Sequence, residues 1–148
     1  MIVLEMGEGM KTNPKNKIKT VLIVEDDKTV LKILVRLLSS EGYITLEAES
    51  GAGAIEIATN FMPDLVILDL KLPDYNGIDV LSRLKKMNKH VQVVILTAFG
   101  SQDAARIAME MGAFDFLTKP FGSDDVIHVV HKALEFGPPV SRQDNHYA

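Results

Sequence analysis

Five short apolar segments alternate with five segments of helical periodicity along this chain, and this alternation restricts the possible folds more than any other feature. We predict strands, rich in aliphatic and β-branched residues, over Val21–Val24, Ile44–Ala48, Leu65–Leu68, Val91–Leu96 and Ala113–Leu117. We predict helices, in which apolar residues recur every three or four positions, over Lys28–Ser40, Ala52–Phe61, Ile78–Met87, Gln102–Met111 and Asp124–Phe136. The predicted element order is (βα)5.

Strands that are apolar throughout are usually covered by helices on both faces, and successive βα units are joined by right-handed crossovers. The order therefore predicts an α/β fold with a doubly wound, open parallel sheet, arranged as a three-layer α/β/α sandwich. Gly42 and Gly112 follow two predicted helices, where a left-handed residue is common, and Ser123 is a predicted cap of the last helix. Ligands of such sheets bind beyond the carboxyl ends of the strands.

Length, charge and cysteine content exclude several classes of protein. The 148 residues suit one domain, expected over 18–136 between a flexible N-terminal extension (1–17) and a C-terminal tail (137–148). The formal net charge is −4 and basic residues form no long run, which argues against direct nucleic-acid binding. Without cysteine there are no disulfides or thiolate sites. No apolar run is long enough for a membrane span, and Glu5 and Glu8 stand where a signal peptide would have a basic and then an apolar region, so we expect a cytoplasmic protein.

Polar side chains follow four of the predicted strands. They are Glu25, Asp26 and Asp27 after the first, Asp69 after the third, Thr97 after the fourth, and Thr118 and Lys119 after the fifth. Asp27 precedes the first predicted helix and fits an N-cap, whereas Asp69 and Lys119 do not open a helix. Because the carboxyl ends of parallel strands meet at one edge of the sheet, we expect these groups to lie together.

The chemistry of this predicted group points to a metal ion and a phosphoryl group. Carboxylates of Glu25, Asp26 and Asp69 at one edge would repel each other unless a hard divalent cation lay among them, and oxygen ligands suit Mg²⁺ or Mn²⁺. A carboxylate can also act as a nucleophile and form an aspartyl phosphate. Phosphoryl transfer needs positive charge and hydrogen-bond donors around the phosphoryl oxygens, which a metal ion, Lys119 and Thr97 supply.

Four motifs occur in a familiar order and spacing, namely VLIVEDD, VILDLKLPDYNG, VVILTAFG and FDFLTKPF. On these motifs, the segment from Lys19 to Phe136 resembles the receiver domains of two-component response regulators, most of all receivers of the nitrogen-regulation type and single-domain sporulation phosphorelay proteins. The resemblance implies a flavodoxin-like fold with strand order 2-1-3-4-5. It also implies that Asp69 is the phosphoacceptor of a signalling domain that is not an enzyme, apart from possible loss of its own phosphoryl group.

The resemblance further implies roles for single residues around Asp69. The metal ligands would be Glu25, Asp26, Asp69 and the backbone carbonyl of Lys71. Thr97 would be the switch hydroxyl, Phe116 the switch aromatic and Lys119 the amine that neutralises the phosphoryl group, with a cis peptide bond between Lys119 and Pro120. The implied partners are a sensor histidine kinase or a histidine phosphotransfer protein, and a downstream protein target.

Three positions depart from the common pattern of these receivers. Glu25 stands where many members have Asp, Asn76 where Asp is frequent, and Phe116 where Tyr is common. None of these changes removes the predicted ability to be phosphorylated. Lys71 and Phe99 flank the expected route of an attacking water, so they are candidates for setting the phosphoryl lifetime.

Two other classes of function remain open at this point. A phosphatase of the haloacid-dehalogenase type also uses a strand-end Asp with Mg²⁺, but it normally has a second Asp two residues later, where this chain has Lys71. A binding module that works without phosphorylation is disfavoured by the intact Asp69, Thr97 and Lys119. Within the receiver interpretation, the sequence does not choose between a phosphorelay intermediate and an endpoint that binds a separate target.

Three further features have structural interpretations. Gly51 and Gly53 fit a helix start better than a nucleotide-binding loop, because the other glycines and the Lys of such a loop are missing. His128, three positions before His131, is expected on a solvated helix face. Met109 and Met111 are expected to pack in the core.

Overall fold

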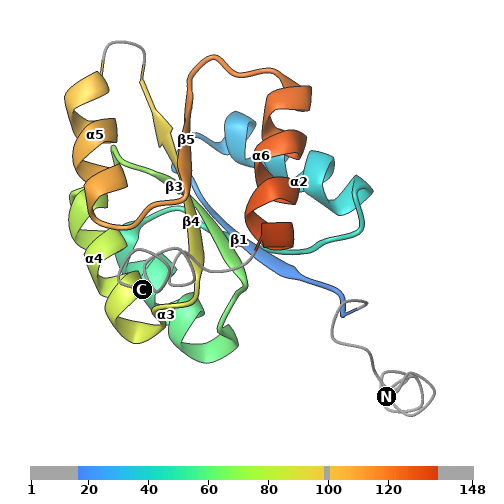
Figure 1. Cartoon of the computed structure of the whole chain (residues 1–148), viewed down its shortest axis with the longest axis horizontal. Coiled ribbons are helices and arrows are strands. Elements are labelled where there is room, and N and C mark those ends of the chain that lie inside the picture. Colours follow the sequence, from blue (N-terminus) through green and yellow to red (C-terminus); the bar gives the residue numbers. More distant parts are fainter. Residues whose placement is uncertain (1–16, 99–100, 137–148) are drawn as a thin grey trace, which may run out of the picture.

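A computed structural model describes residues 17–98 and 101–136 and contains the five predicted βα units (Figure 1). The strands are β1 (Thr20–Val24), β2 (Ile44–Ala48), β3 (Leu65–Asp69), β4 (Gln92–Thr97) and β5 (Asp115–Thr118). The helices are α2 (Lys28–Ser40), α3 (Gly51–Phe61), α4 (Gly77–Met87), α5 (Gln102–Glu110) and α6 (Ser123–Phe136). The predicted elements are therefore confirmed, with boundaries that differ by one or two residues.

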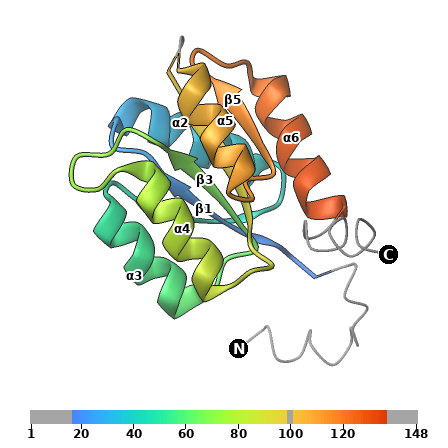
Figure 2. The same ribbon diagram turned by 60° about the vertical axis from the view of Figure 1, so that its left-hand side comes forward.

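The five strands form one parallel sheet in the order β2-β1-β3-β4-β5, which confirms the predicted doubly wound topology. Helices α3, α4 and α5 cover one face of this sheet, and α2 and α6 cover the other (Figures 1 and 2). The chain reverses its direction of winding between β1 and β3, which are hydrogen-bonded neighbours. The carboxyl ends of these two strands therefore mark the place where a ligand is expected.

Alternate residues of the central strands fill two separate cores, because side chains of a strand point to opposite faces in turn. Leu22 and Leu68 pack under α3, α4 and α5, whereas Ile23 and Ile67 pack under α2 and α6, and all four are fully buried. Each such side chain contributes about 1.5–3 kcal/mol through burial. The unbroken apolar runs thus reflect a sheet that is covered on both faces.

Helix boundaries follow local backbone chemistry. The carboxylate of Asp27 accepts hydrogen bonds from the first turn of α2, which confirms its predicted capping role. Gly42 and Gly112 have φ angles of +94° and +103°, as predicted for the left-handed positions after helices. The predicted cap Ser123 is instead the first residue of α6, and the N–H of Gly122 donates to the carboxylate of Asp125.

Strand β5 begins two residues later than predicted, because the N–H of Ala113 bonds to the carbonyl of Ala108 and so closes the end of α5. Residues 1–16 of the predicted extension (1–17), the predicted tail over 137–148, and Phe99 lie outside the described residues. Among the helices that the structure describes, none has the length and apolar character that crossing a membrane requires.

Candidate functional site

Three acidic side chains converge at the carboxyl edge of the sheet. Glu25 directly follows β1, Asp26 comes next, and Asp69 is the last residue of β3. One carboxylate oxygen of each lies within 4.8 Å of those of the other two. Glu25 and Asp69 are buried, whereas Asp26 is exposed, so the group is open to solvent on the side of Asp26. The structure brings together the three acids that the sequence grouped.

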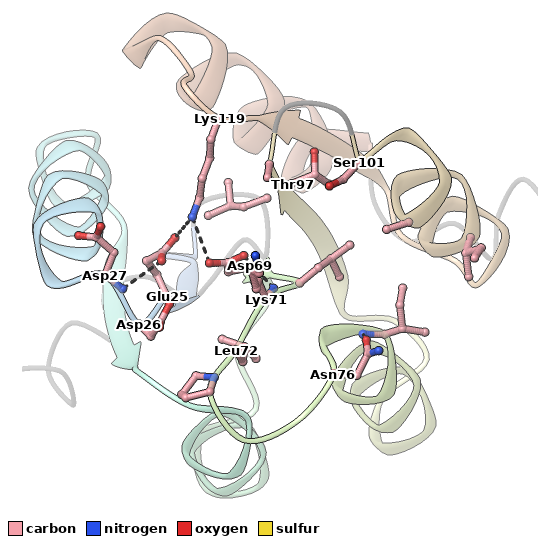
Figure 3. A pocket seen from close by; sticks show the side chains of 17 residues that line it. Glu25, Asp26, Asp27, Asp69, Lys71, Leu72, Asn76, Thr97, Ser101 and Lys119 are labelled. Atoms are coloured by element: carbon pink, nitrogen blue, oxygen red, sulfur yellow. Dashed lines mark hydrogen bonds and ion pairs between the residues drawn. The ribbon is translucent and has the colours of Figure 1, made fainter.

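Lys119 completes this group from the segment after β5 (Figure 3). Its Nζ lies 2.8 Å from Glu25 Oε1 and 3.0 Å from Asp69 Oδ2. The peptide bond between Lys119 and Pro120 is cis. Since three carboxylates face a single ammonium group here, the described part of the site carries an excess of negative charge.

Burial and charge act against each other on the pKa values of this site. Burial raises the pKa of Glu25, and the neighbouring Lys119 only partly opposes this shift. Burial would lower the pKa of Lys119, but its bonds to Glu25 and Asp69 outweigh that effect and raise the pKa. Lys119 is therefore held as a cation between the two buried carboxylates.

Main-chain groups orient the two buried carboxylates. The N–H of Lys71 donates to Asp69 Oδ1 over 3.0 Å, and the N–H of Asp27 donates to Glu25 Oε2 over 3.1 Å. One oxygen of Asp69 thus faces the backbone of the loop after β3, while the other faces Lys119. This arrangement holds the Asp69 carboxylate in a defined orientation towards the open side of the site.

Thr97 is the last residue of β4, is buried, and lines the same pocket as Asp69. Phe116 is not among the residues that line this pocket; it lies on β5 with 40% of its surface exposed. The structure therefore brings Thr97 and Lys119 to Asp69 and places Phe116 on the outside of the sheet edge.

The pocket extends further than the strand ends. Its volume is about 870 Å³, and it continues from the acids into a groove between the start of α4 and helix α5. The groove is lined by Leu70, Ile78, Leu96, Ala104 and Ile107. The polar residues at the strand ends, which locate the acids, give no indication of this groove. Ile107 on α5, which lines it, is 40% exposed.

The structure also bears on the methionines, histidines and glycines whose positions are predicted from the sequence. Met111 packs against the core as predicted, but the prediction for Met109 is wrong, because 37% of its surface is exposed. His128 and His131 lie on α6 outside the core, and His131 Nε2 lies 3.4 Å from Glu41 Oε1. Gly51 is the first residue of α3, as expected for a helix start.

The donor set fits a hard divalent cation. Three carboxylates in close approach need more positive charge than one ammonium group supplies, and all three ligands are oxygens. Asp26 lies on the exposed side, which leaves room for the water ligands that Mg²⁺ retains. The residues present are therefore compatible with Mg²⁺ or Mn²⁺.

Comparisons with known proteins agree on one family. The model of the response regulator receiver domain matches residues 21–131. Sporulation initiation phosphotransferase F of Bacillus subtilis is 38% identical over 114 residues, which are 77% of this chain and 92% of that protein. The DNA-binding transcriptional regulator NtrC of Escherichia coli is 33% identical over 114 residues, which are 77% of this chain but 24% of the regulator.

A solved structure shows the same fold. The response regulator receiver domain protein from Clostridium thermocellum superposes with a TM-score of 0.77 at 34% identity, over 80% of this chain and 95% of that one. The resemblance to sporulation and nitrogen-regulation receivers is thus confirmed.

Proposed function

This chain belongs to the family of response regulator receiver domains, and from that premise we propose that Asp69 accepts a phosphoryl group from the phosphohistidine of a sensor kinase or a phosphotransfer protein. The observation that carries the proposal is the contact of Asp69 with both Lys119 Nζ and the N–H of Lys71. These donors orient the carboxylate and supply positive charge beside it. The domain is a component of two-component signalling.

In the proposed transfer, a carboxylate oxygen of Asp69 attacks the phosphorus atom. A P–O bond forms, the P–N bond to the histidine breaks, and the imidazole leaves with the electron pair of that bond. Glu25, Asp26, Asp69 and the carbonyl of Lys71 would hold Mg²⁺, which supplies positive charge to the phosphoryl oxygens. Lys119, already paired with Asp69, neutralises part of the charge that arrives.

The same residues support a conformational switch. Thr97 is buried and lines the pocket of Asp69, and in the proposed switch its hydroxyl turns towards Asp69 and donates to a phosphoryl oxygen. Phe116 is exposed at the surface of β5. In the proposed switch it turns inward once the phosphoryl group is bound. The proposed output is a shift of population between two packings of the surface formed by β4, α5, β5 and α6.

A phosphorelay role has specific support. The Bacillus subtilis relative is named a phosphotransferase, and the chain covers 92% of it. Helix α2 starts directly after the acids, and its exposed residues Lys32, Ile33 and Arg36 line a separate hollow that Ser123 at the start of α6 completes. We therefore propose that the donor and acceptor histidine proteins use α2 and the loops around Asp69. Because sensor histidine kinases are phosphorylated at the expense of ATP, the proposal includes a cytoplasmic location.

The phosphatase alternative has no support in the geometry. Lys71, where that class has its second Asp, has an exposed side chain and touches Asp69 through its backbone N–H. A slow loss of the phosphoryl group by hydrolysis remains part of the proposal, with Lys71 beside the path of the water. The downstream target is a protein that recognises the switched surface.

The test is the intact mass after incubation with acetyl phosphate and Mg²⁺. We expect one phosphoryl group on the wild type, none on Asp69→Asn, none after chelation, and an unchanged level on the control Asp79→Asn, whose carboxylate lies on α4 outside the site. Because small donors react unevenly, a kinase and beryllofluoride binding are used as well. Phosphorylation of Asp69→Asn would remove Asp69 from its proposed role. No phosphorylation in any format would contradict the proposal and favour a binding module.

A further inference from the structure

The loop between β3 and α4 is attached to a helix that lies outside the phosphorylation site. The carboxylate of Asp74, at the tip of this loop, accepts the N–H of Gly51 at 2.8 Å and the N–H of Ala52 at 3.0 Å. These are the first two residues of α3, whose N–H groups have no partner within the helix. Figure 2 shows this loop beside the start of α3.

Side-chain packing strengthens the same attachment. Tyr75 packs so closely on Gly51 that a Cβ atom there would lie 2.6 Å from Tyr75 Cδ2. The guanidinium of Arg83 lies 5.8 Å from the centre of the Tyr75 ring, within the range of a cation–π contact. Consistent with the hydrogen bonds, the N–H groups of Gly51 and Ala52 lower the pKa of Asp74. The tip of the loop is therefore held by a carboxylate and an aromatic ring together.

The base of the loop is fixed as well. Lys71 and Asn76 form an antiparallel bridge, and the N–H of Gly77 donates to the carbonyl of Leu70 over 2.9 Å. A Cβ atom at Gly77 would lie 2.3 Å from Leu70 Cα, so only glycine permits this approach. The loop is thus a closed hairpin whose base touches the phosphoacceptor through the N–H of Lys71.

We propose that Asp74 is a positioning residue that sets the metal affinity of the site, by fixing the loop so that the backbone carbonyl of Lys71 faces Glu25 and Asp26. The inference rests on the metal site of the proposed function. The contacts at the base fix the two arms of the hairpin to each other, whereas attachment of its tip to α3 also fixes the orientation of the whole hairpin relative to the sheet. A metal ion then meets ligands that are already in place.

The attachment also stabilises α3, so a matched control must separate the two effects. Ser50 caps the same helix end from the other side, because its Oγ accepts the N–H of Gly53 at 3.0 Å. Ser50→Ala removes a cap of α3 and leaves the contacts of Asp74 intact. Gly51→Ala instead keeps the Ser50 cap but displaces Tyr75, because its new methyl group would lie 2.6 Å from Tyr75 Cδ2, so it disturbs the attachment of the loop from the side of α3.

The experiment measures the Kd of Mg²⁺ by titration calorimetry and by the amide chemical shift of Lys71, without a phosphodonor. We expect Asp74→Ala to weaken Mg²⁺ binding on the order of tenfold, the usual scale for residues that orient ligands. Gly51→Ala weakens it in the same direction. Ser50→Ala keeps the wild-type Kd, although urea unfolding shows that it loses stability, and Asp74→Asn, which retains one acceptor oxygen, falls in between.

Three outcomes would overturn the inference. Equal Kd values for wild type and Asp74→Ala show that the attachment does not position the ligand. Equal weakening in Asp74→Ala and Ser50→Ala shows that the stability of α3 alone is responsible. If the wild type itself fails to bind Mg²⁺, both this inference and the metal step of the proposed function are wrong, whereas the first two results leave phosphorylation of Asp69 untouched.

Discussion

At the carboxyl edge of the sheet, the buried carboxylates of Glu25 and Asp69 share one ammonium group, whereas at the amino edge polar side chains pair with main-chain groups. There, Asp64 Oδ2 accepts the N–H of Thr20 at 2.8 Å, and Gln92 Nε2 donates to the carbonyl of Ala133 at 3.1 Å. Both edges therefore bury polar atoms, but only one gathers like charges.

A lysine at each edge shows the difference most directly. Lys119 lies between two carboxylates, and its pKa is raised. Lys85, at the amino edge, donates to the carbonyl of Val91 over 2.8 Å, and burial lowers its pKa. Lys119 balances the negative charge of the carboxylates at the site, whereas Lys85 ties α4 to the loop before β4. The carboxyl edge is thus the place where stability is given up for reactivity.

The largest effect is expected at Lys119. Lys119→Met leaves Glu25 and Asp69 without a cation, and in the presence of a chelator it should destabilise the fold by about 2 kcal/mol, allowing for the partial exposure of the lysine. Mg²⁺ should restore part of that loss, because it replaces the missing charge. Urea unfolding with and without Mg²⁺ measures both quantities.

Lys85→Met is the matched control at the amino edge. This lysine contacts carbonyl groups rather than carboxylates, and burial disfavours its charged form. Its replacement should therefore change stability by no more than about 1 kcal/mol, and Mg²⁺ should stabilise the variant as much as the wild type without restoring that change. Similar losses and similar Mg²⁺ responses in the two variants would refute the contrast between the edges.

A smaller effect is expected at Asp64. Asp64→Ala leaves the N–H of Thr20 without its acceptor and should cost about 1 kcal/mol in urea unfolding. Phosphorylation by acetyl phosphate should proceed at the wild-type rate, because this side chain is at the far edge from Asp69. Asp64→Asn, which keeps an acceptor oxygen, should lose less stability. A slowed phosphorylation in either variant would show that the two edges are coupled.

The smallest effect is expected at Asp26 and has the opposite sign. Asp26→Asn removes one of three like charges, so in chelator it should raise Tm by about 2 °C. The further gain in Tm that Mg²⁺ produces in the wild type should disappear. Thermal unfolding followed by circular dichroism measures both, and a lower Tm in chelator would show that repulsion among the carboxylates does not limit the stability of this edge.

Prediction from the sequence succeeds where the signal is local. The N-cap at Asp27 and the left-handed glycines at 42 and 112 depend only on neighbours within one turn of chain, and the structure confirms them. The capping role predicted for Ser123 is wrong by one residue, because Gly122 and Asp125 close that helix start instead. The predicted core position of Met109 rests on its residue type alone. Met109 is exposed because burial on a short helix depends on which face of the helix a residue occupies, and its position faces away from the core.

The attachment of Asp74 could not be predicted, because its partners Gly51 and Ala52 are 23 and 22 residues away and their backbone N–H groups carry no residue-specific signal. The same holds for Gln92, which meets a carbonyl 41 residues later. Contacts of side chains with distant main chain leave no pattern in a single sequence.

By itself, the sequence determined the (βα)5 order, the burial of both sheet faces and the edge at which Asp69 would meet other polar groups, since hydrophobic periodicity and strand direction are local properties. Only the tertiary structure decided that Lys119 contacts one carboxylate oxygen of Glu25 and one of Asp69. It also decided that Phe116 lies outside the pocket and that the loop after Asp69 is attached to α3. These contacts join segments that are distant in the sequence, and their geometry is set by the packing of the whole domain.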